Sequence, residues 1–141
     1  LYEEATVRDG TNGFEYVYDE PKARPRASAR LLAHFDRLRV AGWGAADGVR
    51  LFPGALLAGS TCIESREYRE HLRRRVPDGE DVVVGGEMEA AGLAAVCGDG
   101  ASEWVIVKGV LDFATPVSRA EINNERRALA ARNAARCTLD A

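Results

Sequence analysis

The sequence contains few of the residues that bind metals or form disulfide frameworks, with two histidines and three cysteines among 141 residues. The cysteines, Cys62, Cys97 and Cys137, are odd in number and show no paired zinc-binding spacing. We therefore expect reduced thiols in a cytoplasmic protein, with no metal site and no cofactor. No histidine lies close to Cys62 in sequence, so we expect a packed or pocket-lining side chain there rather than a reactive thiol.

Long hydrophobic runs and an excess of basic residues are also absent. No apolar run approaches the roughly 18 residues of a transmembrane helix, and no signal peptide opens the sequence. The formal net charge is −3, which gives no electrostatic attraction to nucleic acid or to an anionic membrane. We therefore expect neither of these partners.

What is present describes a globular protein, because 46% of the residues are hydrophobic and 29% are charged. A length of 141 residues is enough for one core and too short for two ordinary ones, so we expect a single domain over 1–141. Because the sequence begins with leucine, we expect it to be part of a longer protein.

Turn residues and apolar spacing predict the order of the elements. Asp-Gly and Asn-Gly pairs between two β-prone stretches predict a hairpin over 1–20. Apolar residues recur at helical spacing over 27–40 and predict an amphipathic helix. Strands and helices are then expected to alternate over 51–139. The expected strands are 51–60, 82–86 and 104–111, and the expected helices are 66–76, 88–97 and one that runs from a Ser118–Glu121 capping box to about Cys137.

This alternation predicts an α/β fold, a layered and mostly parallel sheet flanked by helices. The stretches 82–84 and 104–107 are continuously apolar, as in strands that are buried on both faces. The arginines of the helix expected at 66–76 alternate with glutamates, so we interpret them as a solvated face rather than a phosphate site.

The same order places acidic residues where ligands collect in open α/β sheets, beyond the carboxyl ends of the strands. Glu87, Met88 and Glu89 follow one expected strand, and Asp112 follows the next. A third loop, 60–63, follows the strand before them. The structural alternatives are a solvated first-turn glutamate at Glu89 and a turn or cap residue at Asp112.

The motifs "GGEMEAAGLAAV" at 85–96 and "WVIVKGVLDFA" at 104–114, together with "GALLAGSTCI" at 54–63, resemble the nucleoside phosphorylase and nucleosidase superfamily. Glu89 and Asp112 stand 23 positions apart, as in that family's pattern. The resemblance spans roughly residues 15–139. It implies the carboxy-terminal part of a phosphorylase-like domain, because nothing in 1–50 resembles the family's first strands, its Gly-rich anion-binding loop or its water-positioning acid.

The resemblance implies cleavage of the N-glycosidic bond of a purine nucleoside or nucleotide through an oxocarbenium-like transition state. Glu89 would accept hydrogen bonds from the ribose hydroxyls, with Met88 and Glu87 beside the sugar. Asp112 would donate a proton to purine N7 or hold the leaving base by hydrogen bonds. The implied base-binding residues are Ser60, Cys62, Ile63 and Phe113.

The sequence departs from the family pattern at two positions near these residues. Leu111 stands where many relatives have serine, and Cys62 stands where many have an aromatic side chain that stacks on the base. Phe113 is a candidate for the missing stacking contact, which contributes about 1–3 kcal/mol in nucleic-acid proteins.

Three functions remain open at this point. The first is a purine nucleosidase, or alternatively a phosphate-dependent phosphorylase, in which this chain supplies the ribose and base contacts. The second is a non-catalytic nucleoside-binding or nucleotide-binding module, and the third is a structural piece in which Glu89 and Asp112 are only caps. The resemblance also implies a homo-oligomer, with phosphate as a further partner of a phosphorylase.

Overall fold

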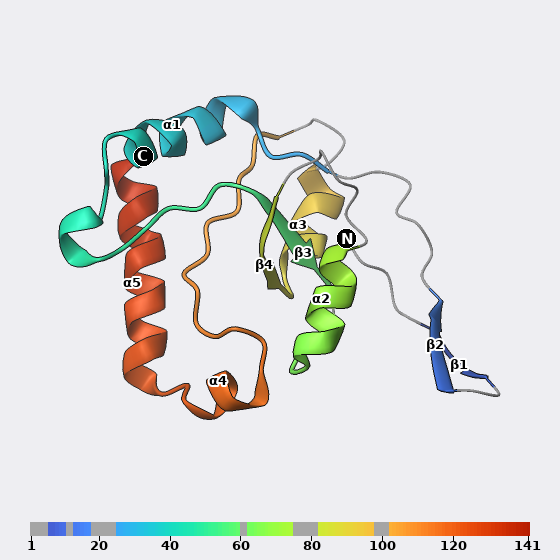
Figure 1. Cartoon of the computed structure of the whole chain (residues 1–141). Helices are drawn as coiled ribbons and strands as arrows, with labels where there is room; N and C mark the ends of the chain where they lie inside the picture. The colour runs from blue at the N-terminus through green and yellow to red at the C-terminus, as the bar shows by residue number, and fades with distance from the viewer. Residues whose placement is uncertain (1–5, 11–12, 18–24, 60–61, 75–81, 98–101) are drawn as a thin grey trace.

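The fold comes from a computed structural model of the chain, which describes residues 6–10, 13–17, 25–59, 62–74, 82–97 and 102–141 (Figure 1). Its helices are α1 (Ala29–Val40), α2 (Arg66–Arg74), α3 (Ala90–Cys97), α4 (Pro116–Ala120) and α5 (Asn124–Asp140), with a 3-10 turn η1 (Ala45–Asp47). Its strands are β1 (Thr6–Gly10), β2 (Gly13–Val17), β3 (Ala55–Ala58) and β4 (Val83–Glu87). None of the described helices is both long and apolar enough to cross a membrane.

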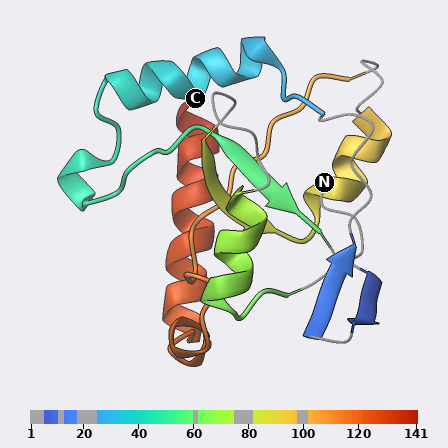
Figure 2. The same ribbon diagram turned by 45° about the vertical axis from the view of Figure 1, so that its right-hand side comes forward.

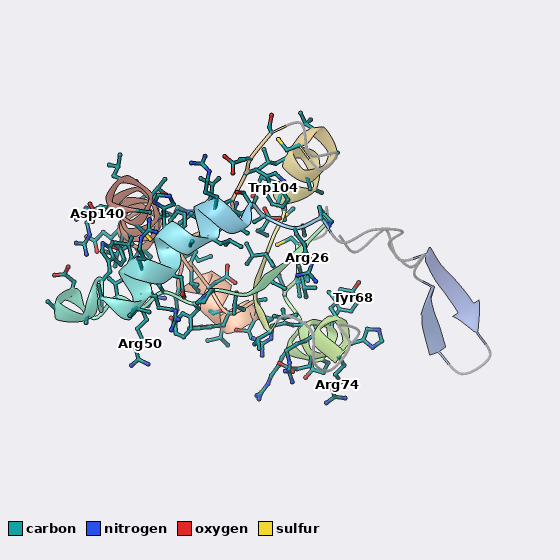
Figure 3. The ribbon with its side chains drawn as sticks, turned by 90° about the horizontal axis from the view of Figure 1, so that it is seen from above. Arg26, Arg50, Tyr68, Arg74, Trp104 and Asp140 are labelled. Atoms are coloured by element: carbon teal, nitrogen blue, oxygen red, sulfur yellow. The ribbon has the colours of Figure 1, made fainter. Side chains whose placement is uncertain are left out.

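The hairpin predicted within 1–20 is confirmed for its described part. β1 and β2 pair antiparallel, from Thr6 opposite Val17 to Gly10 opposite Gly13. The pair lies apart from the other elements in Figures 1 and 3. The helix predicted over 27–40 is confirmed as α1, and it begins where the Ser28 side chain accepts a hydrogen bond from the amide of Leu31.

β3 and β4 form a parallel pair, which is the part of the predicted sheet that the structure shows. Ala58 at the end of β3 pairs with Glu87 at the end of β4, and the Gly59 amide extends the ladder to the Glu87 carbonyl at 3.2 Å. Figure 3 shows α2 and α3 on opposite sides of this pair. The expectation that 82–84 is buried on both faces is wrong, because Val82 is 74% exposed and the next two valines are half-buried.

The third strand predicted at 104–111 is not present, since these residues form no strand. The segment instead runs alongside α5 (orange beside red in Figures 1 and 2). Its first residues are held by the start of α1, where the Ser28 amide donates to the Trp104 carbonyl at 2.8 Å. At Gly109 it approaches α5 so closely that a Cβ atom there would lie 2.6 Å from the Ala130 carbonyl carbon. These contacts with helices replace the expected pairing with the sheet.

We predict that Gly109→Ala destabilises the fold, because its methyl group would overlap the α5 backbone at Ala130. Overpacking of this kind costs roughly 1–3 kcal/mol, so the urea midpoint of unfolding should fall clearly. Gly92→Ala is the matched control, because a Cβ at Gly92 meets no atom within 4 Å and alanine favours the α3 helix. Equal midpoints for Gly109→Ala and the unsubstituted protein would contradict the close approach.

The long final helix predicted from the Ser118–Glu121 capping box is wrong at its start. The structure divides the region into α4 and α5, and Asn123 caps α5 by accepting from the amide of Arg126 at 2.9 Å. Ser118 lies inside α4, where its amide donates to the Thr115 hydroxyl at 3.2 Å. Thr115 and Asn123 therefore provide the caps in place of the predicted box, and the side chain of Glu121 pairs with Arg126.

α1 contacts α5, and residues of the loop that follows α1 also contact α5 (Figure 1). The Trp43 indole donates to Asp140 at 2.8 Å, while the Arg136 guanidinium lies 4.7 Å from the Trp43 ring centroid and pairs with Asp47. Among the described residues, the buried apolar side chains come from β3, α2, α3 and α5, one from each element. They are Ala58, Leu72, Ala94 and Cys137.

We predict a specific acid sensitivity at the junction between α1 and the 102–113 segment. Arg30 and Ser28 donate hydrogen bonds to the Glu103 carboxylate, and these bonds hold its pKa at about 2 instead of the ordinary 4.5. A lowered pKa in the folded state contributes stability above pH 4.5 that is lost as the pH falls toward 2. Because the Arg30 and Glu103 side chains are 69% and 47% exposed, solvent screens the pair, so Glu103→Gln should lower the urea midpoint at pH 7 only slightly, and the difference should vanish near pH 2. A midpoint difference that stays constant over this range would contradict the pairing.

Candidate ribose and base site

The glutamate–methionine–glutamate motif lies at the end of β4, and its first glutamate is a structural cap. Glu87 is the last residue of β4, and its Oε2 accepts from the amides of Glu89 and Ala90, both at 2.8 Å. These amides belong to the start of α3, where a carboxylate is favoured by the unpaired N–H groups and the helix dipole. Only 4% of the Glu87 side chain is exposed, and no described group donates to its Oε1. Glu87 therefore fixes the backbone of the motif.

Lys108 joins the two glutamates. Its Nζ lies 2.5 Å from Oε2 of Glu89 and 3.5 Å from Oε2 of Glu87. The hydrogen bond from Lys108, and then its charge, lower the pKa of Glu89 below the ordinary value, and the same bond raises the pKa of Lys108. Glu89 is therefore ionised at neutral pH and is held toward the 102–113 segment.

The outer part of this cluster is open. The side chain of Glu89 is 74% exposed, and Met88 is 47% exposed beside it. An ion pair this exposed adds little to stability, so the Lys108–Glu89 pair mainly orients the carboxylate. An oriented carboxylate next to an apolar thioether is suited to a ligand that presents hydroxyl groups on a carbon ring.

The loop predicted to read the base leaves the neighbouring strand at the same edge of the sheet. Because β3 and β4 are parallel and end side by side at Ala58 and Glu87, this loop begins next to the motif. Ser60 lies outside the described residues. Cys62 is exposed rather than packed, and Ile63 is half-buried just before α2.

Asp112 lies in a tight turn at the end of the 102–113 segment, just before α4. Its Oδ1 accepts from the Ala114 amide at 2.6 Å, and Ala114 has a left-handed φ of 53°. The Ser118 hydroxyl accepts from the amides of Phe113 and Thr115, each at 3.2 Å. Asp112 is half-buried in this turn, and the Phe113 side chain is 70% exposed and available to a planar ligand.

α2 connects the two loops that were predicted to contact the base. It starts just after Ile63, and its Arg69 donates from Nη1 to the Phe113 carbonyl at 2.6 Å. The 102–113 segment in turn carries Lys108, four residues before Asp112. Their Cα atoms are therefore at most about 14 Å apart. The segment thus joins the predicted ribose residues to the predicted base residues.

Two residues of this arrangement had no functional role in the sequence-based prediction. Lys108 lies four residues before Asp112 within the quoted stretch 104–114, and the sequence-based prediction gave it no role. Arg69 gave no local signal, because it contacts a carbonyl 44 residues away.

The described residues contain no group of three or more histidine, cysteine, aspartate or glutamate side chains that could hold a metal ion. Comparison with known proteins gave no match: no protein-family model, curated protein or solved structure resembles the chain closely enough to be matched.

Proposed function

We propose that this chain binds the ribose and the base of a purine nucleoside or nucleotide, and that the protein carrying it cleaves the N-glycosidic bond by hydrolysis. Glu89 accepts hydrogen bonds from the ribose hydroxyls, and Met88 packs against the sugar. Asp112 acts at the purine, where it holds the leaving base or gives a proton to N7. Cys62, Ile63 and Phe113 surround the base.

The observation that carries the proposal is the Lys108–Glu89 pair at the end of β4. Glu89 is exposed enough to meet a ligand, ionised through its contact with Lys108, and fixed at its backbone by the buried Glu87 cap. A charged acceptor binds hydroxyl groups more strongly than a neutral one. Its negative charge also stabilises the cationic sugar that develops as the glycosidic bond breaks.

The base side of the proposal depends on the Asp112 turn. In the reaction the bond between C1′ and the purine nitrogen breaks with its electron pair moving to the base, and the oxygen of water forms the new bond to C1′. The water releases one proton and the base gains one, so the products are the free sugar and the neutral base. The base leaves more readily when its N7 receives a proton or a hydrogen bond. Asp112, the acid of this turn, is four residues from Lys108 along the same segment.

The proposal is tested by measuring release of free base from a panel of purine nucleosides and nucleotides. The native full-length protein and this 141-residue chain are assayed in parallel, with and without phosphate. We expect the full-length protein to release base without phosphate. Release that requires phosphate would identify a phosphorylase instead.

Two further outcomes would overturn the enzymatic part. If a nucleoside binds saturably but neither protein releases free base, the chain would be a non-catalytic binding module. Neither binding nor release would favour the structural alternative, in which Glu89 and Asp112 serve only the helix start and the turn in which the structure places them.

A further inference from the structure

One peptide group connects an arginine of α2 to Asp112. The carbonyl of Phe113 accepts from Nη1 of Arg69 at 2.6 Å, and the amide on the other side of the same peptide, that of Ala114, donates to Oδ1 of Asp112 at 2.6 Å. We propose that Arg69 is a positioning residue for Asp112 and that it acts through this peptide. The catalytic part of the inference rests on the proposed function above.

The guanidinium is itself held in place. Nη2 of Arg69 bonds to Oε1 of Glu70 at 3.1 Å, and only 34% of the Arg69 side chain is exposed. A planar guanidinium with one bond to a carboxylate and another to a carbonyl has little rotational freedom. It therefore fixes the direction of the Phe113 carbonyl and, through the rigid peptide plane, the direction of the Ala114 amide.

The turn needs such an anchor because of its backbone conformation. Ala114 adopts a φ of 53°, a region in which side chains other than glycine are uncommon and strained. A rotation of the Phe113–Ala114 peptide would relieve this strain, and it would also withdraw the amide from Asp112. The charge-assisted bond from Arg69 opposes that rotation. Hydrogen bonds in such a chain also polarise one another, so the amide becomes a stronger donor to Asp112.

Arg73 provides a matched control on the same helix. Its Nε donates to Oε2 of the same Glu70 at 2.9 Å, and its side chain is 58% exposed. Arg69 and Arg73 therefore share a helix and a carboxylate partner. They differ in the hydrogen bond that Arg69 donates to the Phe113 carbonyl, which is the contact under test.

The catalytic readout uses the native full-length protein with Arg69→Met, Arg69→Lys and Arg73→Met. We expect Arg69→Met to lower kcat for base release about tenfold, with KM changed less than threefold because the ribose contacts of Glu89 remain. Arg69→Lys should recover most of the loss, since an ammonium group can still donate to the carbonyl. Arg73→Met should leave both constants unchanged. Equal losses in Arg69→Met and Arg73→Met, or an unchanged kcat in Arg69→Met, would overturn the catalytic role.

The second readout requires no activity. Hydrogen exchange of the Ala114 amide should become at least tenfold faster in Arg69→Met, stay near the native rate in Arg69→Lys and remain unchanged in Arg73→Met. Unchanged exchange in Arg69→Met would show that Arg69 does not hold the peptide. Absence of base release from the unsubstituted protein would instead overturn the proposed function and the catalytic role with it, while the exchange rates still decide whether Arg69 positions Asp112.

Discussion

Replacing Glu89 with alanine should weaken binding of a purine nucleoside such as adenosine by at least about 100-fold. Each hydrogen bond to a charged group contributes about 1.5–3 kcal/mol, and a factor of ten in Kd corresponds to about 1.4 kcal/mol. Loss of two ribose hydroxyl contacts therefore accounts for the expected change. The fold should persist, because the side chain of Glu89 is 74% exposed and the α3 amides remain capped by Glu87.

Glu125→Ala is the control for this prediction, since Glu125 is an exposed glutamate in the first turn of α5. Calorimetric titration of both variants gives the comparison. Because Lys108 lowers the pKa of Glu89, the carboxylate stays ionised and the affinity should be nearly constant from pH 7 to pH 5. A Glu89→Ala protein that binds as tightly as Glu125→Ala would remove Glu89 from the ribose site.

Replacing Asp112 with asparagine should lower the turnover of base release by about 10²–10⁴, the usual contribution of a general acid. Asparagine keeps a side-chain oxygen that can accept from the Ala114 amide, so the turn itself should be retained. What it loses is the acid that can give a proton to the base.

The measurement for Asp112→Asn is kcat for base release under saturating nucleoside, with Asp36→Asn as the control. Asp36 is an exposed aspartate of α1 that pairs with Arg39. We expect Asp36→Asn to behave as the unsubstituted protein. An Asp112→Asn protein that retains turnover within threefold would show that the reaction does not use this carboxyl.

Local signals in the sequence were sufficient for much of the fold. Asp-Gly and Asn-Gly pairs predicted the hairpin β1–β2, and apolar spacing predicted α1. β3, α2, β4 and α3 also appear in the predicted order. The hairpin and α1 are specified by neighbouring residues, through turn formers, apolar spacing and the Ser28 cap.

One error arose where distant contacts decide the structure. An apolar run such as 104–111 resembles a buried strand, but a strand also needs a partner along its length, and here Gly109 packs on Ala130 of α5 instead. The capping box at Ser118 was wrong for a local reason. Thr115 accepts from the Ser118 amide in α4 and Asn123 accepts from the Arg126 amide in α5, so the region forms two capped helices in place of the single one predicted.

Some features of the candidate site could likewise be predicted from the sequence and others could not. The placement of Glu89 after a strand could be predicted from the order of elements, because parallel strands end at one edge of a sheet. The contact of Lys108 with Glu89 joins residues 19 positions apart, and no local pattern predicts it. Glu87 was predicted to lie beside the ribose. Because α3 begins at Ala90 and not at Met88 as expected, the Glu87 carboxylate instead caps the start of the helix and is buried there.

The most direct test of the central claim, that Glu89 binds the ribose hydroxyls, is a cycle of four binding constants. Adenosine and 2′,3′-dideoxyadenosine are titrated into the native full-length protein and into its Glu89→Ala variant. We predict that removing the hydroxyls weakens binding to the unsubstituted protein by at least about 100-fold and changes binding to Glu89→Ala by less than threefold. An equal loss in both proteins, or no loss in either, would contradict the claim.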